Sequence, residues 1–504
     1  MTQSITAAEA AEKWEISKRR VQKLCSEGRI YGAEKHGNIW MVPADAPKPG
    51  DGRATRYKDD DCSIPASPIL TSIDLFAGPG GLATGFRWAG IKPLIAVEWS
   101  YWTVQTYSHS HNAEILDLAQ YEIDPTSIEP LLVESDRPIV IYGDINKVSI
   151  GLIKQLLATR YGLESVDIVT GGAPCESFSM AGDRKEIDER NQLYRNVLRI
   201  ARGVDSKMFM FENVKGLFSK KHDGKPEAMY QAICDEFESD LDDGSPSYRL
   251  ASRDKDTVLL KAIDYGVPQM RERLFLVGLN NKYPDLAFSY PKHSNGLGCD
   301  YECVTVADAL ADLPSIAMGQ ESSKYTFDID TVECGMARGQ FLRRMRGDLS
   351  MAPQHLKFGR DTLSAHKAPG HTNKMLGRIK LIKQGESMRT AYLRLITEGR
   401  EDEAAAFFPR KIYGARNRRL KPNEPSFTVT SHCLDEMIHP TANRGLTPRE
   451  AARLQSFPDW YAFEGPYMKF HSDPEQDQYE QIGDAIPPLL AYALGREVCK
   501  TLAD

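Results

Sequence analysis

The stretch GGAPCESFS, residues 171–179, carries a single cysteine whose surroundings suggest chemistry. Cys175 follows a proline in a glycine-flanked turn, directly behind the apolar run VDIV. Three roles are open to such a thiol: a buried structural group, a metal ligand or a nucleophile. Only Cys299 and Cys303 lie close together, with no second Cys or His pair at ligand spacing, so a zinc site is disfavoured. The charged sequence after Cys175, ESFSMAGDRKEIDERN, is unlike a core and favours an exposed thiol.

Two further stretches beside apolar runs supply acidic, amide and cationic groups. FMFENVKGL places Glu212 after one predicted strand, and YGVPQMRERLFLVGL places Gln269, Arg271 and Arg273 at the start of another. A thiol, a carboxyl and a guanidinium at one sheet edge are a set suited to nucleophilic catalysis with acid–base support.

These residues depend on a sheet for their placement. From Thr71 onward, short apolar runs alternate with helical segments, and we predict strands at 72–76, 93–98, 139–143, 166–170, 208–213 and 273–279. Fully apolar strands separated by amphipathic helices indicate an α/β fold with a mostly parallel, doubly wound sheet covered on both faces. Ligands of such folds bind beyond the carboxyl ends of the strands, where nearly all the special motifs fall.

A second group of motifs indicates a cofactor site at the same edge. SIDLFAGPGGLATGF puts glycines in the turn between a strand and a helix, where a ligand can approach the backbone closely. The spacings of dinucleotide and phosphate-binding loops are absent, which disfavours NAD and ATP. Acids end the next two strands, at Glu98 for ribose hydroxyls and Asp144 for an exocyclic amine, a layout typical of S-adenosylmethionine sites. The predicted cofactor-binding residues are Asp74, Phe76, Gly78, Gly80, Gly81, Leu82, Glu98, Trp99, Asp144, Ile145, Pro174, Asp484 and Ala485.

Size and composition set wider limits. The 504 residues suffice for two or three domains; 41% are hydrophobic and 26% charged, and no apolar run is long enough to cross a bilayer. The nine scattered cysteines and a start without a secretory signal predict a cytoplasmic protein, which we expect to be a monomer. A net charge of -7 excludes a chain that is basic throughout, so nucleic-acid contact must come from local basic patches.

Residues 1–47 are predicted to form a separate module, joined by a linker at 48–70. Helix, tight turn, helix and hairpin follow one another, and residues 1–58 hold 11 Lys/Arg against 7 Asp/Glu. The pattern resembles the winged helix-turn-helix of MerR and excisionase-type DNA binders, with Lys18, Arg19 and Arg20 beginning the recognition helix. A helical cap or protein-contact module with a basic face is the alternative.

The remaining chain divides into a catalytic domain at 71–290, a second lobe at 291–423 and a C-terminal segment at 424–504. The alternation of strands and helices breaks down in the second lobe, which we expect to be irregular and basic. The C-terminal segment returns to helical patterning and should pack back on the sheet.

The chain resembles the DNA cytosine-5 methyltransferases. The resemblance rests on DLFAGPGG, GGAPCESFS, ENV, QMRER, LTPREAARLQSFPD and QIGDAIPP, in the family's order, and extends from about residue 72 to residue 502. It implies S-adenosylmethionine as cofactor, Cys175 as the nucleophile on cytosine carbon 6, and Glu212 at ring nitrogen 3. Arg273 would hold the base's carbonyl oxygen, with Arg271 and Gln269 in support. No metal is required.

The resemblance also implies double-stranded DNA with one flipped cytosine as substrate. The loop at 177–191 would close over the base, and the lobe at 291–423 would recognise the target. The predicted DNA contacts are Ser179, Arg184, Arg190, Arg416, Arg418 and Arg419, together with Lys18, Arg19 and Arg20 of the N-terminal module. The chain departs from the family pattern at Glu176, Asn191 and Asp484.

We therefore predict a sequence-specific DNA methyltransferase, most consistent with the protective partner of a bacterial restriction system. A related class with the same core methylates transfer RNA, but the long variable lobe and the N-terminal module favour DNA. Binding of residues 1–47 to the protein's own promoter is a further function of a different class. A catalytically inactive DNA binder is disfavoured because Cys175, Glu212 and Arg273 are all present.

Overall fold

The computed structural model describes residues 4–14, 17–26, 34–36, 39–43, 70–173, 193–220, 228–240, 244–292, 303–332, 337–347, 362–469 and 473–502. The chain divides into two compact units, Met1–Ile64 and Pro65–Asp504, and each is described by itself. The division falls inside the segment predicted to be a linker, of which only Leu70 is among the described residues.

The first unit contains two short helices and a three-stranded antiparallel sheet of order β1-β3-β2. Its elements are β1 (Ser4–Thr6), α1 (Ala7–Trp14), α2 (Lys18–Ser26), β2 (Glu34–His36) and β3 (Ile39–Pro43). The Thr6 backbone N donates to Glu9 Oε2 (2.7 Å) and the Glu9 N donates to Thr6 Oγ1 (3.3 Å), so these two residues form a capping box at the start of α1. The buried core residues of this unit are Ala7, Ala10, Ala11, Val21, Cys25 and Val42.

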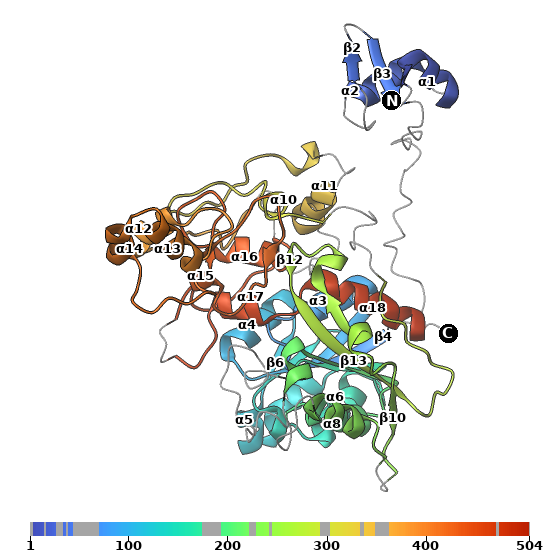
Figure 1. The fold of residues 1–504 in the computed structure, drawn as a ribbon. Helices are drawn as coiled ribbons and strands as arrows, with labels where there is room; N and C mark the ends of the chain where they lie inside the picture. The colour runs from blue at the N-terminus through green and yellow to red at the C-terminus, as the bar shows by residue number, and fades with distance from the viewer. Residues whose placement is uncertain are drawn as a thin grey trace. The chain divides into compact units, whose positions relative to one another are not determined.

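The second unit is built on a nine-stranded sheet of order β10-β13-β9-β8-β4-β5-β7-β6, with β11 paired to β13 (Figure 1). The strands are β4 (Leu70–Leu75), β5 (Ile91–Glu98), β6 (Glu114–Asp117), β7 (Ile139–Tyr142), β8 (Ile168–Gly171), β9 (Met208–Val214), β10 (Tyr248–Leu250), β11 (Leu259–Lys261) and β13 (Glu272–Asn280).

The strands from β6 to β9 in this order are parallel, and β13 runs antiparallel to β9. The predicted mostly parallel α/β fold is therefore confirmed. The prediction missed β6, β10 and β11, which are only three or four residues long and show no extended apolar run.

Strand β4 lies where the strand order reverses. The chain passes from β4 to β5 and beyond on one side, and later returns to β8 on the other side of β4. The carboxyl ends of strands at such a switch point border the crevice in which α/β proteins bind ligands. We therefore expect a ligand site at the turns after β4, β5 and β8.

Both faces of the sheet are covered. Along β9, Met208 and Met210 join one buried cluster while Phe209 and Phe211 join the other, as the two-residue period of a strand requires. The helices of this unit are α3 (Gly81–Ala89), α4 (Tyr101–His111), α5 (Leu118–Ile123), α6 (Ile150–Tyr161), α7 (Arg195–Gly203), α8 (Ala228–Phe237), α9 (Lys255–Val258), α16 (Pro448–Leu454), α17 (Gln478–Asp484) and α18 (Pro488–Leu502). Short helical turns occur at η1 (Pro125–Leu132), η2 (Ile145–Lys147), η4 (Lys215–Ser219) and η5 (Ala262–Tyr265).

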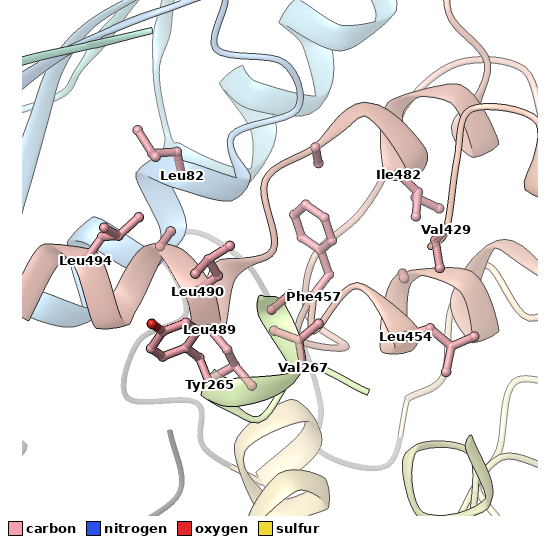
Figure 2. Packing of buried hydrophobic residues seen from close by; sticks show 14 of the residues in the cluster. Leu82, Tyr265, Val267, Val429, Leu454, Phe457, Ile482, Leu489, Leu490 and Leu494 are labelled. Carbon is pink, nitrogen blue, oxygen red and sulfur yellow. The ribbon is translucent and has the colours of Figure 1, made fainter. Parts of the chain in front are cut away.

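The C-terminal segment packs against the first helix of the sheet domain. Figure 2 shows Leu82 of α3 near Leu490 and Leu494 of α18, with Phe457 and Ile482 in the same buried cluster. Residues more than 370 positions apart in the chain thus form one hydrophobic core. This core fixes α16 and α17 relative to the turn after β4.

The segment predicted to be an irregular lobe contains more helix than expected. Its elements are α10 (Val306–Ala309), η6 (Ile329–Thr331), α11 (Ala337–Leu342), η7 (Arg343–Gly347), α12 (Asn373–Leu381), α13 (Met388–Thr397), α14 (Glu401–Phe407) and β14 (Arg418–Arg419), followed by β15 (Ser426–Phe427), α15 (Cys433–Glu436) and β16 (Met437–Ile438). Helices α12 to α14 surround a small core of their own, so irregular structure was the wrong prediction for residues 373–407. Short amphipathic helices with many charges give only a weak periodic signal.

No helix in the described part of the chain is long and apolar enough to cross a membrane. Within the same residues, no group of three or more His, Cys, Asp or Glu side chains is arranged to hold a metal ion.

Candidate active site

The turn after β4 needs glycine for steric reasons. Gly80 has φ +97°, and a Cβ at this position would lie 2.4 Å from His111 Nε2 and 2.8 Å from Tyr461 Oη. Phe76 and Gly78 also have positive φ, at 55° and 56°. The backbone therefore curls tightly ahead of α3, where the N–H groups of Ala77 and Gly80 donate to the carbonyls of Val97 and Ala77.

Glu98, at the end of β5, organises this turn. Its carboxylate accepts hydrogen bonds from the backbone N–H groups of Gly78 (2.9 Å), Trp99 (2.9 Å) and Ser100 (3.0 Å). Burial raises the pKa of Glu98, and the three N–H donors oppose that effect. The Trp99 side chain, by contrast, is 52% exposed beside it. An acid and an exposed aromatic ring thus meet at the strand end, as the cofactor hypothesis requires.

Asp74, at the same edge, has the features expected of a carboxylate that binds a ligand. Its Oδ1 accepts from Thr170 Oγ1 (2.9 Å), whereas its buried Oδ2 bonds to nothing in the described part of the protein. Burial raises the pKa of Asp74 to about 7, and nearby Glu98 adds to the rise. A buried carboxylate oxygen without a partner is costly, and a cationic ligand would relieve it. S-adenosylmethionine carries an ammonium and a sulfonium, so the residues present fit this cofactor.

The other predicted cofactor residues lie around the same crevice. Asp144 is exposed and accepts from the Asn146 N–H (2.9 Å), and Ile145, Leu82 and Ala485 are buried. Asp484 Oδ2 accepts from Gln476 Nε2 (2.9 Å), and desolvation raises the pKa of Asp484 to about 6 although part of the residue reaches solvent. Pro174 lies outside the described residues.

Sequence reasoning missed Glu475 at this site. Glu475 Oε2 accepts from the Tyr101 backbone N (2.6 Å) and from Ser100 Oγ (3.0 Å), so it caps the N-terminus of α4 next to Glu98. The two partners are more than 370 residues apart in the chain, and no local pattern marks Glu475 as a capping residue.

Glu212 and Arg273 form a largely buried ion pair where β9 ends and β13 begins. We call this part of the sheet the reaction edge. Arg273 Nε lies 2.9 Å from Glu212 Oε1, and the two side chains are 15% and 14% exposed. Burial raises the pKa of Glu212, opposed by Arg273 and then by Arg271. A Cβ on Gly172 would lie 2.6 Å from Glu212 Oε2, so a side chain at this position would displace the carboxyl. Gly172 precedes Cys175 by three residues, and Cys175 itself lies outside the described residues.

Gln269 and Arg271 take a different position from Arg273. Gln269 is fully buried, donates to the Leu454 carbonyl (2.8 Å) and accepts from the Val429 N–H (3.0 Å). Arg271 is 1% exposed and donates to the carbonyls of Val429 (2.8 Å) and Gly483 (2.9 Å). Both side chains therefore tie the strand of Arg273 to the C-terminal segment rather than pointing to an open site.

The predicted DNA contacts separate into four groups, one of which is the half-buried Arg418, stacked on Phe427. Arg416 is exposed, with its guanidinium 5.5 Å from the Tyr413 ring, and Lys18 and Arg19 are exposed on α2. Arg419 is buried and bonded to protein acceptors, which argues against a DNA contact from this residue. Ser179, Arg184 and Arg190, as well as the side chain of Arg20, lie outside what the structure describes.

The fold and this edge define an α/β transferase with a site for a nucleotide-type cofactor. The chain belongs to the C-5 cytosine-specific DNA methylase family, whose model matches residues 70–500, and it is a DNA cytosine-5 methyltransferase. Members of this family use S-adenosylmethionine. The family resemblance read from the six motifs is thereby confirmed.

Named relatives agree with this assignment. The chain is 30% identical over 429 residues to Type II methyltransferase M.DdeI of Desulfomicrobium norvegicum, covering 85% of this chain and 88% of the relative. It is 26% identical over 509 residues to Type II methyltransferase M.PspPI of Psychrobacter sp., covering 99% and 96%. A crystal structure of a prophage-encoded candidate DNA modification methyltransferase of E. coli has a TM-score of 0.58 at 24% identity, covering 86% and 100%, and supports the fold.

Proposed function

We propose that this methyltransferase transfers a methyl group from S-adenosylmethionine to carbon 5 of a flipped-out cytosine in double-stranded DNA, through a covalent adduct with Cys175. The observation that carries the proposal is the Glu212–Arg273 pair, held against Gly172 in the chain that leads to Cys175. A nucleophile, an acid and a cation would then act on one ring.

Cytosine carbon 5 is a poor nucleophile, and the Cys175 thiolate would change that by adding to carbon 6. The electron pair of the former 5,6 double bond moves into the ring, and negative charge develops toward nitrogen 3 and the carbonyl oxygen. The family's cofactor supplies, when bound, a methyl group on a positively charged sulfur. Once carbon 5 carries the methyl, loss of its proton and departure of the thiolate restore the aromatic ring.

Glu212 would protonate or hydrogen-bond ring nitrogen 3 as charge develops there. A raised pKa favours the protonated form of this carboxyl relative to an ordinary glutamate, which suits a proton donor. Arg273, bound to Glu212 through Nε and to the Glu272 carbonyl through Nη1 (2.8 Å), would offer Nη2 to the carbonyl oxygen of the base. Gln269 and Arg271 would serve as positioning residues, because their side chains bind the C-terminal segment.

The Type II names of the relatives support modification of one short DNA motif, as in a restriction-modification system. Bisulfite sequencing of host DNA from cells that express the protein should find 5-methylcytosine at one motif, and Cys175→Ala should remove it together with covalent trapping on 5-fluorocytosine DNA. Uniform conversion of cytosine in cells expressing the intact protein would refute the proposal. Methylation of transfer RNA instead of DNA, read from bisulfite-treated RNA, would contradict the choice of substrate.

A second function concerns residues 1–47. The order of two helices and a hairpin, with Lys18 and Arg19 exposed on α2, favours binding of DNA, including the protein's own promoter. A chain lacking residues 1–60 should keep methylation and lose promoter retention in gel-shift assays. Lys18→Ala with Arg19→Ala should have the same effect in the full chain, and unchanged retention in both would exclude this function.

A further inference from the structure

Two adjacent arginines on β14 have opposite environments. Arg419 is buried, and its five N–H groups donate to the carbonyls of Ile382 (2.7 Å), Ile379 (2.7 Å), Ala442 (2.9 Å) and His439 (3.1 Å) and to Asn443 Oδ1 (2.8 Å). A guanidinium has five N–H donors, so none is left for a ligand. Arg419 therefore holds the lobe together.

Arg418 lies flat on an aromatic ring. Its guanidinium carbon is 3.4 Å from the centroid of Phe427, and its buried Nε bonds to no acceptor within the described residues. Glu436 is the acid whose charge acts on Arg418, and this carboxylate accepts instead from Thr430 Oγ1 (2.9 Å). A guanidinium stacked in this way is fixed in orientation while its two Nη groups, unlike the buried Nε, stay available as donors.

The ring under Arg418 belongs to the strand pair at the reaction edge. Strand β15 pairs in parallel with β12 (Gln269–Met270), with Gln269 opposite Ser426 and Met270 opposite Phe427. Gln269 and Ser426 are buried, whereas Met270 is 62% exposed. Paired residues point to the same face of a sheet, so Phe427 shares a face that is open to solvent at Met270, while Arg418 stacks on the partly buried Phe427 ring.

This open face is close to the reacting groups along the chain. Arg271 and Arg273 follow Met270 directly, and Arg273 contacts Glu212. Arg418, Phe427 and Met270 thus form a continuous path from the variable lobe to the reaction edge. DNA whose cytosine is held near Glu212 would have its neighbouring base pairs beside this path.

We propose that Arg418 is a specificity-determining residue, which reads a guanine edge next to the target cytosine while stacked on Phe427. The inference rests on the proposed function, because it assumes that flipped cytosine is held at the reaction edge. Two N–H groups of a rigid fork match the O6 and N7 acceptors of guanine, and such a bidentate contact discriminates against other bases by roughly 5- to 150-fold. Lysine cannot reproduce it, since an ammonium is a point charge.

The test compares Arg418→Lys, Arg418→Ala and Phe427→Leu with the intact protein by genome-wide bisulfite mapping in a host without cytosine methylation. We expect both Arg418 variants to lower the methylation rate at the wild-type motif within the 5- to 150-fold range above, and to relax the preference at one guanine. Phe427→Leu should weaken the same position by a smaller factor. Arg400→Ala is the matched control, because Glu398 and Glu403 already hold that guanidinium on the same lobe.

A substrate-side measurement avoids any effect of the variants on folding. Synthetic duplexes in which each guanine of the motif is replaced in turn by 7-deazaguanine, which lacks the N7 acceptor, should lose methylation by the intact protein at one position, and Arg418→Lys should be insensitive there. A motif and rate unchanged in Arg418→Lys would overturn the inference and leave Arg418 as a phosphate contact. Absence of 5-methylcytosine with the intact protein would instead overturn the proposed function, and the inference with it.

Discussion

Glu212 and Arg273 come from antiparallel neighbours, β9 and β13, and join through Arg273 Nε and Glu212 Oε1 at 2.9 Å in a largely buried pair. The carboxyl is thereby oriented by a cation while burial keeps its pKa raised. The Gly172 backbone confines the same carboxyl from the other side. An oriented carboxyl whose protonated form is favoured suits a proton donor to a ring nitrogen.

Glu212→Gln should lower the methylation rate constant by at least about 100-fold, the usual minimum contribution of a positioned acid. Glutamine can donate a hydrogen bond to ring nitrogen 3 but cannot transfer a proton, so DNA binding should persist. Single-turnover methylation and gel-shift assays measure the two effects separately. Glu272→Gln is the control, since Glu272 begins the neighbouring strand β13 and pairs with Lys215 (3.0 Å).

The rate of the intact enzyme should fall as pH rises through the raised pKa of Glu212, because only the protonated carboxyl donates. Glu212→Gln should lack this descending limb while keeping any ascending limb that reflects formation of the thiolate. Rate–pH profiles of both proteins between pH 5.5 and 9 show whether the descending limb is lost in the variant. The same descending limb in the variant would assign it to another group.

Asp74→Asn should stabilise the protein without ligand and weaken its binding of S-adenosylmethionine. The pKa of Asp74 is raised from 3.8 to about 7, so this group favours folding below pH 4 and its contribution is lost as pH rises to 7, by up to about 4 kcal/mol. Thermal unfolding at pH 8 with and without cofactor measures both effects. The intact protein should gain stability between pH 8 and pH 6, and the variant should lose this gain. A variant that is less stable at pH 8 and binds cofactor normally would contradict the assignment.

Arg271→Ala should mainly lose stability, whereas Arg273→Ala should mainly lose activity. Removing Arg271 leaves the carbonyls of Val429 and Gly483 without their donor and should reduce the free energy of unfolding by about 3 kcal/mol. Removing Arg273, which is partly exposed, should abolish most activity at a smaller cost in stability. Denaturant unfolding and methylation assays on both variants separate positioning from contact with the base. Equal loss of stability in both would remove the distinction.

Glu450→Gln should destabilise the protein where the C-terminal segment packs against the lobe at 291–423. Burial opposes ionisation of Glu450, yet two hydrogen bonds of 2.7 Å from Arg444 hold its pKa at about 2. A carboxyl lowered from 4.5 contributes about 3 kcal/mol above pH 4.5, and this is lost as pH falls toward 2. The free energy of unfolding at pH 7 should therefore be lower in the variant than in the intact protein. As pH falls toward 2, it should decrease less steeply in the variant. Glu398→Gln, at an exposed ion-pair residue, should change stability much less than Glu450→Gln.

Much of the fold could be read from local patterns. The apolar runs that became β4, β5, β7, β8, β9 and β13 are long enough to be recognised, and the glycine turn after Asp74 is marked by residue type alone. Strands β6, β10 and β11 were missed because pairing with a neighbour, rather than their own composition, makes them strands. Helices α12 to α14 were missed because their charges obscure the period.

The sequence by itself determined the family, the parallel sheet and the candidate groups at Asp74, Glu98, Glu212 and Arg273, because residue types and spacing at strand ends are local properties. Only the tertiary structure decided which cations are free to act. Arg271 and Arg273 are two residues apart, and Arg418 and Arg419 are adjacent, yet Arg271 and Arg419 bind backbone carbonyls of distant segments, whereas Arg273 pairs with Glu212 and Arg418 stacks on Phe427. Those carbonyls come from segments up to 212 residues away, so hydrogen-bond satisfaction across the fold assigns the role of each side chain.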